Sequence, residues 1–266
     1  MIPSYPRART LDVLGSVGHR FQVWGRWLSA LAGGTSRFAE HRQAQGRRAA
    51  ARQELLALVQ LDDTQVPPDG GWVAGADFLL LLARQVLGQK PKLVVEFGSG
   101  VSSVIIGRCL QLNGQGRLLS FDHDPGFAEL TRRRLRRAGV PGEVRAAPLR
   151  PGHNGYGGSW YDHDELPDGI DLLVIDGPPA WREDQAESRG SAAPVAFAKL
   201  APGAVVLLDD AARPGEQRVA ERWRREHPEI RFDAAGAETQ KGVLIGSRAA
   251  AALIAIVPLL GDLGLA

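Results

Sequence analysis

The sequence predicts an α/β fold with a doubly wound, mostly parallel sheet of seven strands. Short apolar runs of strand length alternate with longer segments of helical spacing, which is typical of parallel strands joined by crossover helices. The last two runs, at residues 230–235 and 241–247, are separated only by a short turn, so they indicate an antiparallel hairpin at the sheet edge. An Arg-rich segment with helical periodicity precedes the alternating part and predicts an N-terminal helical extension.

The alternating part begins with a helix at residues 76–88, after a linker rich in Pro, Gly and Asp. Strands are expected at residues 92–98, 116–122, 143–149, 170–176 and 204–210, before the hairpin. Helices are expected at residues 102–112, 127–139, 192–200 and 215–226. An irregular loop at residues 150–169, either a substrate lid or a solvent loop, joins the third strand to the fourth.

The chain is expected to divide into a helical extension at residues 1–61, a main domain at residues 62–247, and an apolar helix or tail at residues 248–266. The extension contains two helices separated by the sequence "GGTS". A bilayer crossing needs about 20 apolar residues, and Pro258 and Asp262 interrupt the tail. We therefore expect no membrane span, and we expect the tail to dock on the body or on a partner subunit of a homodimer.

The composition is that of one large folded core, because 44% of the 266 residues are hydrophobic and only 23% are charged. A formal net charge of +2 does not call for a nucleic acid or an anionic membrane as partner. The arginine cluster at residues 132–137 lies on an expected helix, where a solvated face is favoured over an RNA-binding patch. The single cysteine, Cys109, cannot form an internal disulfide, which suits the reducing cytoplasm, and it is expected to be a core or helix-face residue rather than a nucleophile.

The first expected strand ends in a glycine-rich turn, "EFGSGVSS". In a doubly wound sheet, ligands bind at the carboxyl ends of the strands, near the point where the strand order reverses. The glycines let the backbone approach a bulky ligand, and a following serine can cap the next helix. The carboxylate before the turn disfavours a pyrophosphate and favours a ligand with a cationic amine and a sulfonium. The cofactor-binding residues predicted here are Glu96, Gly98, Ser99, Gly100, Ser102 and Ser103.

The second expected strand ends in Asp122, about twenty residues beyond the glycine turn, where a carboxylate can accept both hydroxyls of a ribose. His123 either lies against a purine ring or forms the turn. Leu149 at the end of the third strand, and Asp176 with Gly177 at the end of the fourth, complete the predicted cofactor site.

These motifs together resemble the class I S-adenosylmethionine-dependent methyltransferases, whose Rossmann-like sheet ends in an antiparallel seventh strand. The resemblance covers residues 70–247 and rests on "VVEFGSG", "SFDHDP", "IDLLVIDGPP" and "GAVVLLDDAARP". Within the class, "GGWVAGADFLLLL" and "DGPPAWR" are most similar to bacterial small-molecule O-methyltransferases of the catechol and macrocin types. The resemblance implies S-adenosylmethionine as cofactor and a small-molecule hydroxyl as methyl acceptor. It also implies that the N-terminal helices cover the pocket or build a homodimer.

Those relatives commonly hold a divalent cation with an acid after the fourth strand and an acidic or amide pair after the fifth. The resemblance implies Asp176, Asp209 and Asp210 as ligands of Mg²⁺, and it gives Asp176 and Asp209 a catalytic role. A hard cation prefers oxygen ligands and would lower the pKa of an acceptor hydroxyl. Successive strand residues point to opposite faces, so both aspartates of the pair reach one ion only if the strand ends between them. Alternatively, one of the two caps the next helix while the other faces the cofactor pocket.

The sequence departs from the metal-dependent relatives in two places. Asp210 stands where an Asn is common, and "GPPAWR" contains no lysine, so a lysine base is not available there. Arg182 cannot replace it, since a guanidinium stays protonated. The candidate bases are Asp176, His153 or His163, or no base at all where a metal activates the acceptor. Both histidines are expected to be solvated loop residues.

The expected function is methyl transfer from S-adenosylmethionine to an oxygen of a small molecule. Two alternatives stay open. The chain could methylate RNA or protein with the same cofactor site, which only the arginine clusters favour, or it could bind S-adenosylmethionine without catalysis. A strong salt dependence of substrate binding would favour RNA.

Overall fold

The computed structural model describes residues 43–67, 74–153, 155–180, 182–234 and 239–250. The chain divides into two units, residues 1–49 and 50–266. Residues 43–59 are helical, as expected for the second helix of the extension. The first helix of the extension and residues 251–266 of the expected tail lie outside the described residues.

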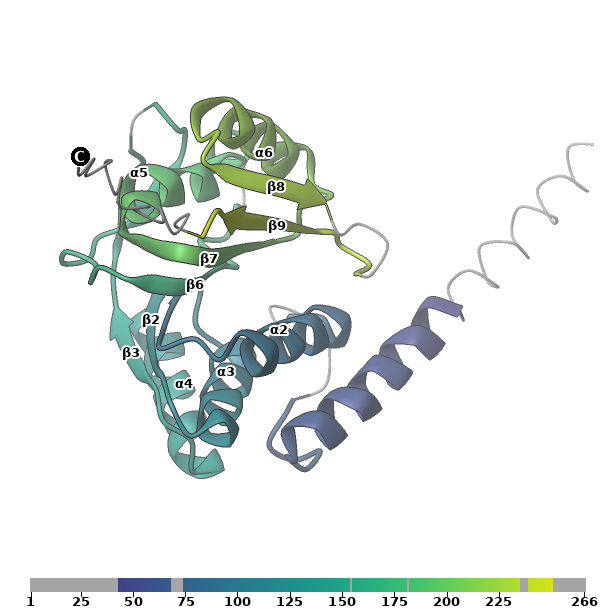
Figure 1. Cartoon of the computed structure of the whole chain (residues 1–266). Coiled ribbons are helices and arrows are strands. Elements are labelled where there is room, and N and C mark those ends of the chain that lie inside the picture. Colours follow the sequence, from purple (N-terminus) through teal and green to yellow (C-terminus); the bar gives the residue numbers. More distant parts are fainter. Residues whose placement is uncertain (1–42, 68–73, 154, 181, 235–238, 251–266) are drawn as a thin grey trace, which may run out of the picture. The chain divides into compact units, whose positions relative to one another are not determined.

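The second unit contains a seven-stranded sheet with the order β3-β2-β1-β6-β7-β9-β8 (Figure 1). Its strands are β1 (Leu93–Phe97), β2 (Arg117–Asp122), β3 (Glu143–Ala146), β6 (Ile170–Ile175), β7 (Leu200–Asp209), β8 (Ile230–Ala234) and β9 (Val243–Arg248). The first five are parallel, and β9 runs antiparallel to both of its neighbours, β7 and β8. The expected mostly parallel sheet with an antiparallel C-terminal hairpin is confirmed. The strand order reverses between β1 and β6, which places the expected ligand site at the carboxyl ends of these two strands.

Helices cover both faces of the sheet (Figure 1). One face carries α2 (Ala76–Gln89), α3 (Val101–Asn113) and α4 (Pro125–Ala138), and the other carries α5 (Ala192–Ala196) and α6 (Pro214–Glu226). The N-terminus of α4 shows why its helix begins where it does. Asp124 accepts hydrogen bonds from the backbone N–H groups of Gly126 and Phe127, and Pro125 stands at the first helical position.

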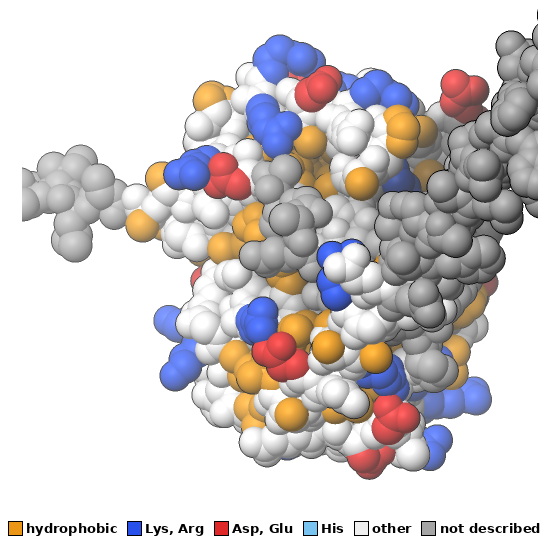
Figure 2. All heavy atoms as spheres, turned by 90° about the vertical axis from the view of Figure 1, so that its right-hand side faces the viewer, with side chains coloured by type: hydrophobic (Ala, Val, Ile, Leu, Met, Phe, Trp, Pro, Cys, Tyr) orange, Lys and Arg blue, Asp and Glu red, His pale blue; other side chains and the backbone are white. Residues whose placement is uncertain are grey.

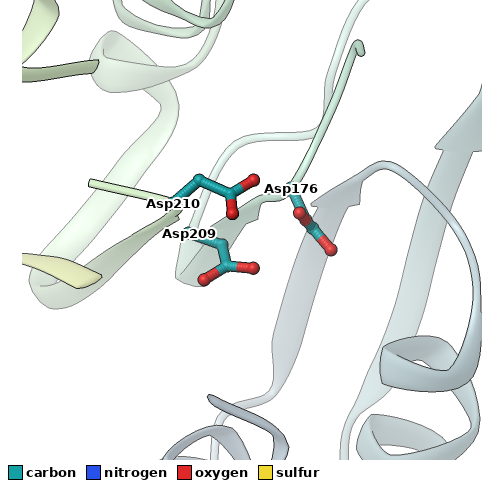
Figure 3. Close-up of side chains that lie close together, drawn as sticks. All are labelled: Asp176, Asp209 and Asp210. Carbon is teal, nitrogen blue, oxygen red and sulfur yellow. The ribbon is translucent and has the colours of Figure 1, made fainter. Parts of the chain in front are cut away.

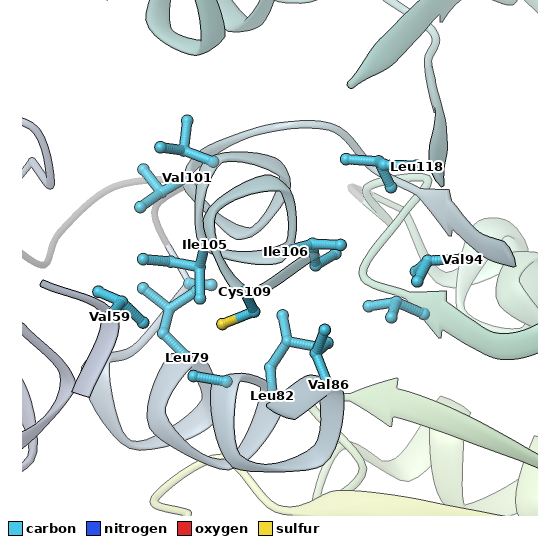
Figure 4. Close-up of a cluster of buried hydrophobic side chains, with 14 of the residues drawn as sticks. Val59, Leu79, Leu82, Val86, Val94, Val101, Ile105, Ile106, Cys109 and Leu118 are labelled. Atoms are coloured by element: carbon cyan, nitrogen blue, oxygen red, sulfur yellow. The ribbon is translucent and has the colours of Figure 1, made fainter. Parts of the chain in front are cut away.

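A cluster of buried aliphatic side chains joins α2 and α3 to the sheet (Figure 4). Leu55 and Val59, from the helix at residues 43–59, belong to the same cluster. Cys109 is fully buried in it, and burial raises the pKa of the Cys109 thiol to about 12. The cysteine is therefore a core residue, as expected. Among the described residues, none of the helices combines the length and the apolar character that a bilayer crossing requires.

The segment expected as an irregular loop at residues 150–169 is partly regular, which corrects the prediction. The third strand ends at Ala146 rather than at Leu149, and the chain then forms a two-stranded antiparallel sheet from β4 (Leu149–Pro151) and β5 (Ser159–Tyr161). Trp160 and Tyr161 of β5 are fully buried against the face of the main sheet that α5 and α6 cover. Aromatic burial therefore holds this segment on the body, whereas the sequence indicated only an irregular loop of glycines and polar residues around three aromatic side chains.

Candidate active site

The turn after β1 lies directly against the end of β6. Gly98 has a φ of +102°, and its N–H donates to the carbonyl of Phe121 at 2.9 Å. A Cβ at Gly98 would lie 2.9 Å from the backbone nitrogen of Gly177, so only glycine permits this approach. A Cβ at Gly100 would meet no atom within 4 Å, so this second glycine borders open space.

Glu96 lies beneath this turn, and its side chain is fully buried. The hydroxyls of Ser103 and Ser120 both donate to one carboxylate oxygen, the second at 2.6 Å. The other oxygen has no hydrogen-bond partner among the described residues. Burial raises the pKa of Glu96 above its ordinary value, although the serine hydroxyls act against this rise. Because Ser103 also accepts the N–H of Gly100 at 3.1 Å, the carboxylate fixes the turn from below, and a direct contact with a cofactor amine stays a prediction.

Asp122 joins the end of β2 to the same turn. Its carboxylate accepts the hydroxyl of Ser99 at 2.7 Å and the backbone N–H of Asp124 at 3.0 Å. Burial raises the pKa of Asp122, and the bond from Ser99 opposes the rise. His123 lies beside it, with Nδ1 at 3.5 Å from the Asp122 carboxylate and about a third of its side chain exposed. Of the other predicted cofactor residues, Ser102 is buried in the first turn of α3, and Leu149 is partly buried in β4.

Asp176 and Gly177 follow β6 directly and lie next to the glycine turn. We call the edge of the sheet that the carboxyl ends of β2, β1, β6 and β7 form the rim. The N–H of Asp176 donates to the carbonyl of Phe97 at 2.9 Å. Gly177 lies against the hydroxyl of Tyr161, which a Cβ at this position would approach to 2.0 Å. The Tyr161 hydroxyl is buried and has no hydrogen-bond partner among the described residues. This unpartnered donor next to Gly177 makes Tyr161 a candidate site residue, which the sequence did not indicate as part of the cofactor site.

Asp176, Asp209 and Asp210 converge at the ends of β6 and β7 (Figure 3). Each offers a carboxylate oxygen, and these three atoms lie within 4.8 Å of one another. The strand β7 ends at Asp209, and Asp210 follows with a φ of +58°, outside the extended conformation. The strand therefore ends between the two aspartates, which was the condition for both to reach one point.

The surroundings of Asp176 and Asp209 raise the pKa values of both carboxyl groups. Burial raises the pKa of Asp176 to about 6, and the Arg189 guanidinium acts against this rise. Burial also raises the pKa of Asp209 well above its ordinary value, and the negative charges of Asp176 and Asp210 add to the rise. The side chain of Asp176 is 18% exposed, whereas that of Asp210 is almost fully buried. Asp176 is therefore the member of the cluster that a ligand can reach from solvent.

Arg189 packs against this cluster, although no motif in the sequence pointed to it. The residue lies in a short 3-10 helix, η2 (Ser188–Ser191), and only 5% of its side chain is exposed. Its guanidinium donates to the backbone carbonyls of Asp176 and Asp209, both at 3.0 Å. It also lies 3.3 Å from the carboxylate of Asp210 and 3.7 Å from that of Glu216.

Two further cations approach Asp210 from the outside. Arg213 contacts its carboxylate at 2.9 Å, and Lys241, from the turn between β8 and β9, contacts it at 3.6 Å. Both side chains are about two-fifths exposed. Three cations, including Arg189, thus face the four carboxylates of Asp176, Asp209, Asp210 and Glu216.

The donor chemistry of the three aspartates fits a hard divalent cation, because all three offer carboxylate oxygens. One oxygen of Asp210 is buried without a hydrogen-bond partner among the described residues, and Asp176 leaves an entry path from solvent. The alternative in which one aspartate caps the following helix finds no support in the contacts, since the start of α6 has no side-chain cap. The metal ligands stay a prediction that the geometry permits.

The two histidines of the segment after β3 differ from each other. His163 packs on Phe121 and Phe97, with ring centroids 5.0 Å and 5.5 Å apart, and burial lowers its pKa. It is thus not a solvated loop residue, because the aromatic rings of β1 and β2 cover it. His153 is half-buried, and its backbone N–H donates to the hydroxyl of Ser191 at 3.0 Å.

Three arginines of the cluster on α4 form ion pairs within their own helix. Arg132, Arg133 and Arg136 all contact Glu129, at 3.3, 3.2 and 3.1 Å. On the face drawn in Figure 2, basic and acidic side chains are interspersed rather than gathered into a field of one sign. These contacts agree with the expected solvated face.

Residues 95–211 match the profile of a family described as a methyltransferase domain. No curated protein matches the chain. Among solved structures, the chain is similar to the methyltransferase PaMTH1 of Podospora anserina with SAH bound, at 14% identity and a TM-score of 0.56, over 78% of this chain and 95% of that one. It is also similar to an O-methyltransferase from Bacillus cereus in complex with SAH, at 16% identity and a TM-score of 0.51, over 75% and 90% of the two chains. A methyltransferase from Geobacter sulfurreducens gives 19% identity and a TM-score of 0.50, over 80% and 96%.

The fold, with its antiparallel β9, is the Rossmann-like fold that this chain shares with these solved methyltransferases. Residues 95–211, which match the methyltransferase-domain profile, contain the glycine turn, Asp122, Asp176 and the aspartate pair.

Proposed function

We propose that this chain transfers the methyl group of S-adenosylmethionine to a hydroxyl oxygen of a small molecule, and that it works in the cytoplasm. The observation that carries the proposal is the convergence of Asp176 and Asp209 at two adjacent strand ends, beside the glycine turn of the methyltransferase domain. Two of the similar structures carry SAH, and one of these is an O-methyltransferase, which supports the choice of cofactor and of acceptor atom.

The cofactor site that we propose extends from the glycine turn to the end of β2. Asp122 would accept the ribose hydroxyls, since its carboxylate stands at the strand end and Ser99 orients it. Gly98 and Gly100 would allow the ligand to approach the backbone, and Ser102, Ser103 and Glu96 would hold the turn beneath it. Further contacts are assigned to His123, Leu149, Asp176 and Gly177. When bound, S-adenosylmethionine supplies an electrophilic methyl group whose bond to sulfur breaks as the bond to oxygen forms, with the electron pair left on sulfur.

The acceptor site that we propose lies over Asp176 and Asp209. The acceptor hydroxyl would donate to one of these carboxylates, which orients the oxygen lone pair toward the methyl group and receives the proton as the new C–O bond forms. Holding two reactants in line accounts for a large part of the catalysis of such a displacement. The two carboxylates would also lie near the positive charge of a sulfonium, which would favour binding of the cofactor over its neutral thioether product.

We propose Asp176, Asp209 and Asp210 as the residues that would hold a divalent cation such as Mg²⁺. A bound cation would supply Lewis acidity that lowers the pKa of an acceptor hydroxyl. The chain's own contribution would be to keep three oxygen donors within reach of one point.

Calorimetric titration with S-adenosylmethionine and with its demethylated product tests the cofactor site. Saturable binding of both at a single site is expected, and the absence of binding by either contradicts the proposal. Repeating the titration in Mg²⁺ and in EDTA tests the metal separately. Cofactor binding that is the same in both solutions would contradict the proposed metal site and leave the proposed methyltransferase activity standing.

Transfer of a labelled methyl group to a panel of catechols, sugars and other hydroxyl compounds tests the acceptor. A methyl ether survives mild base, whereas a methyl ester is hydrolysed, so the stability of the label distinguishes a hydroxyl acceptor from a carboxylate. Label on RNA or protein instead, or cofactor binding without transfer to any class of acceptor, would support one of the two alternative functions.

A further inference from the structure

We propose that Arg189 is the resident counter-ion of the aspartate cluster, so that the free protein keeps its carboxylates together without a metal and binds divalent cations weakly. The proposal concerns the rim to which we assign methyl transfer. It stands on charges and contacts that do not depend on that assignment.

The guanidinium of Arg189 is held in one place by the backbone. The parallel pairing of β6 with β7 ends at Ile175 and Leu208, and the next carbonyl on each strand, of Asp176 and Asp209, accepts one N–H of Arg189 at 3.0 Å. The arginine thus joins the two strand ends one residue beyond the last ladder pair. A planar group with several donors can make these two bonds and still face carboxylates, which a lysine ammonium cannot do from one position.

The segment that carries Arg189 is itself fixed. Trp223 of α6 donates from its indole nitrogen to the carbonyl of Gly190 at 3.2 Å, and the hydroxyls of Ser188 and Ser191 each accept a backbone N–H from the segment after β3. The side chain is 5% exposed. Its positive charge is therefore a permanent part of the buried rim rather than a mobile surface charge.

The positive charge of Arg189 compensates the negative charges of the aspartate cluster, as a bound metal cation would. The guanidinium lies 3.3 Å from the Asp210 carboxylate and 3.6 Å from that of Asp176, and Glu216 contacts its other side at 3.7 Å. A buried group of like charges without a counter-ion is strongly destabilised. Because a positive charge at this distance also repels a divalent ion, the same arrangement weakens metal binding.

Arg213 provides a matched control. It contacts the same carboxylate, of Asp210, at the shorter distance of 2.9 Å, yet 44% of its side chain is exposed. Within the described ranges, its guanidinium donates to no backbone carbonyl of the rim. Solvent screens such a pair, so its removal changes the field in the cluster much less. Arg189→Gln and Arg213→Gln remove the same charge from the same partner and differ in burial.

The test is a titration of cofactor-free protein with Mn²⁺, followed by electron paramagnetic resonance, together with thermal unfolding in Mg²⁺ and in EDTA. We expect the wild type and Arg213→Gln to bind Mn²⁺ weakly, within about threefold of each other, and to unfold at nearly the same temperature in both solutions. Arg189→Gln is expected to bind Mn²⁺ at least about tenfold more tightly and to gain thermal stability from Mg²⁺. Equal Mn²⁺ affinity in Arg189→Gln and the wild type overturns the proposal, as does tight binding by the wild type.

Removal of Arg189 alone could prevent folding, so a second variant keeps the proposal testable. If Arg189→Gln is unfolded in both solutions, the double variant Arg189→Gln/Asp210→Asn removes one charge of each sign. Recovery of a cooperative unfolding transition supports the counter-ion role, and continued unfolding overturns it. Titration of the folded proteins with S-adenosylhomocysteine tests the proposed function independently. If the wild type does not bind it, the proposed function is contradicted, but the comparison of Mn²⁺ affinities still tests the role of Arg189.

Discussion

The hydroxyl of Ser99 donates to the carboxylate of Asp122 at 2.7 Å, and this bond connects the glycine turn after β1 to the end of β2. If Asp122 binds the cofactor ribose, Asp122→Ala should weaken binding of S-adenosylhomocysteine by about 10- to 100-fold, because hydrogen bonds to a charged group contribute roughly 1.5 to 3 kcal/mol. Ser99→Ala should have a smaller effect, since it removes only the group that orients the carboxylate. Calorimetric titration measures both.

Asp124 is the control for this prediction. It is an aspartate on the same turn, but it caps α4 through the N–H groups of Gly126 and Phe127. Asp124→Ala should cost about 1 kcal/mol of stability and leave cofactor affinity unchanged. A comparable loss of affinity in the Asp124 and Asp122 variants would contradict a specific ribose contact.

The two adjacent aspartates at the end of β7 should respond oppositely to neutralisation. Asp210 contacts Arg189, Arg213 and Lys241, so Asp210→Asn removes the shared partner of three cations and is expected to lower the unfolding free energy by about 2 to 4 kcal/mol. Asp209 has no ion pair within 4.0 Å among the described residues and faces two other carboxylates, so Asp209→Asn should be neutral or stabilising. Urea unfolding at pH 7.5 tests this asymmetry, and equal losses in both variants would refute it.

Tyr161 is expected to act through its unpartnered hydroxyl. A buried hydroxyl without a partner costs roughly 1 to 3 kcal/mol, so Tyr161→Phe should not destabilise the ligand-free protein. Its position against Gly177 should make the same change weaken cofactor binding several-fold. Tyr156→Phe is the matched control, because the Tyr156 hydroxyl already donates to Glu226 at 3.3 Å, on α6. Unchanged affinity in Tyr161→Phe would remove this residue from the cofactor site.

Glu96 gives the protein a pH dependence of known sign. Its pKa in the folded protein lies above the ordinary value of 4.5, chiefly because the carboxylate is buried, so the folded state holds the proton more tightly than the unfolded chain. The resulting stability is fully present below pH 4.5 and is lost as the pH rises through the folded pKa. Glu96→Gln keeps an oxygen that can accept the hydroxyls of Ser103 and Ser120 and cannot ionise. Relative to the wild type, the variant should therefore be more stable at pH 8 than at pH 4.

Urea unfolding between pH 4 and pH 8 checks this prediction. The difference between the two proteins at pH 4 is the internal reference, because both carry a neutral group there. A difference that stays constant over the whole range would show that folding does not change the pKa of Glu96, and it would contradict this prediction.

The strand ends were predictable because they depend on local patterns. The glycine turn, Asp122, Asp176 and the pair at 209 and 210 each follow a short apolar run, and parallel topology alone brings such ends to one edge. Whether Asp209 and Asp210 would point to one place was not predictable, since it depends on the backbone of a single residue. The φ of +58° at Asp210 decides it.

Arg189 and Tyr161 could not be predicted for a different reason. Neither residue follows a strand of the main sheet. Arg189 reaches the rim because η2 packs on α6, and Tyr161 reaches it because β5 packs on β1. Tyr161 lay in a stretch of glycines and polar residues that carried no periodic signal, so its burial, and the small sheet that β4 and β5 form, were missed.

The position of β9 between β7 and β8 has a consequence for how the protein is made. On the ribosome, β7 leaves the exit tunnel before β9, so one edge of β7 stays unpaired until residues 243–248 have been synthesised. Lys241, which contacts Asp210, is synthesised just before these residues and therefore also long after β7. A nascent chain stalled before this point would carry an exposed sheet edge and an incomplete rim, which makes it a natural client for chaperones that bind unpaired strands.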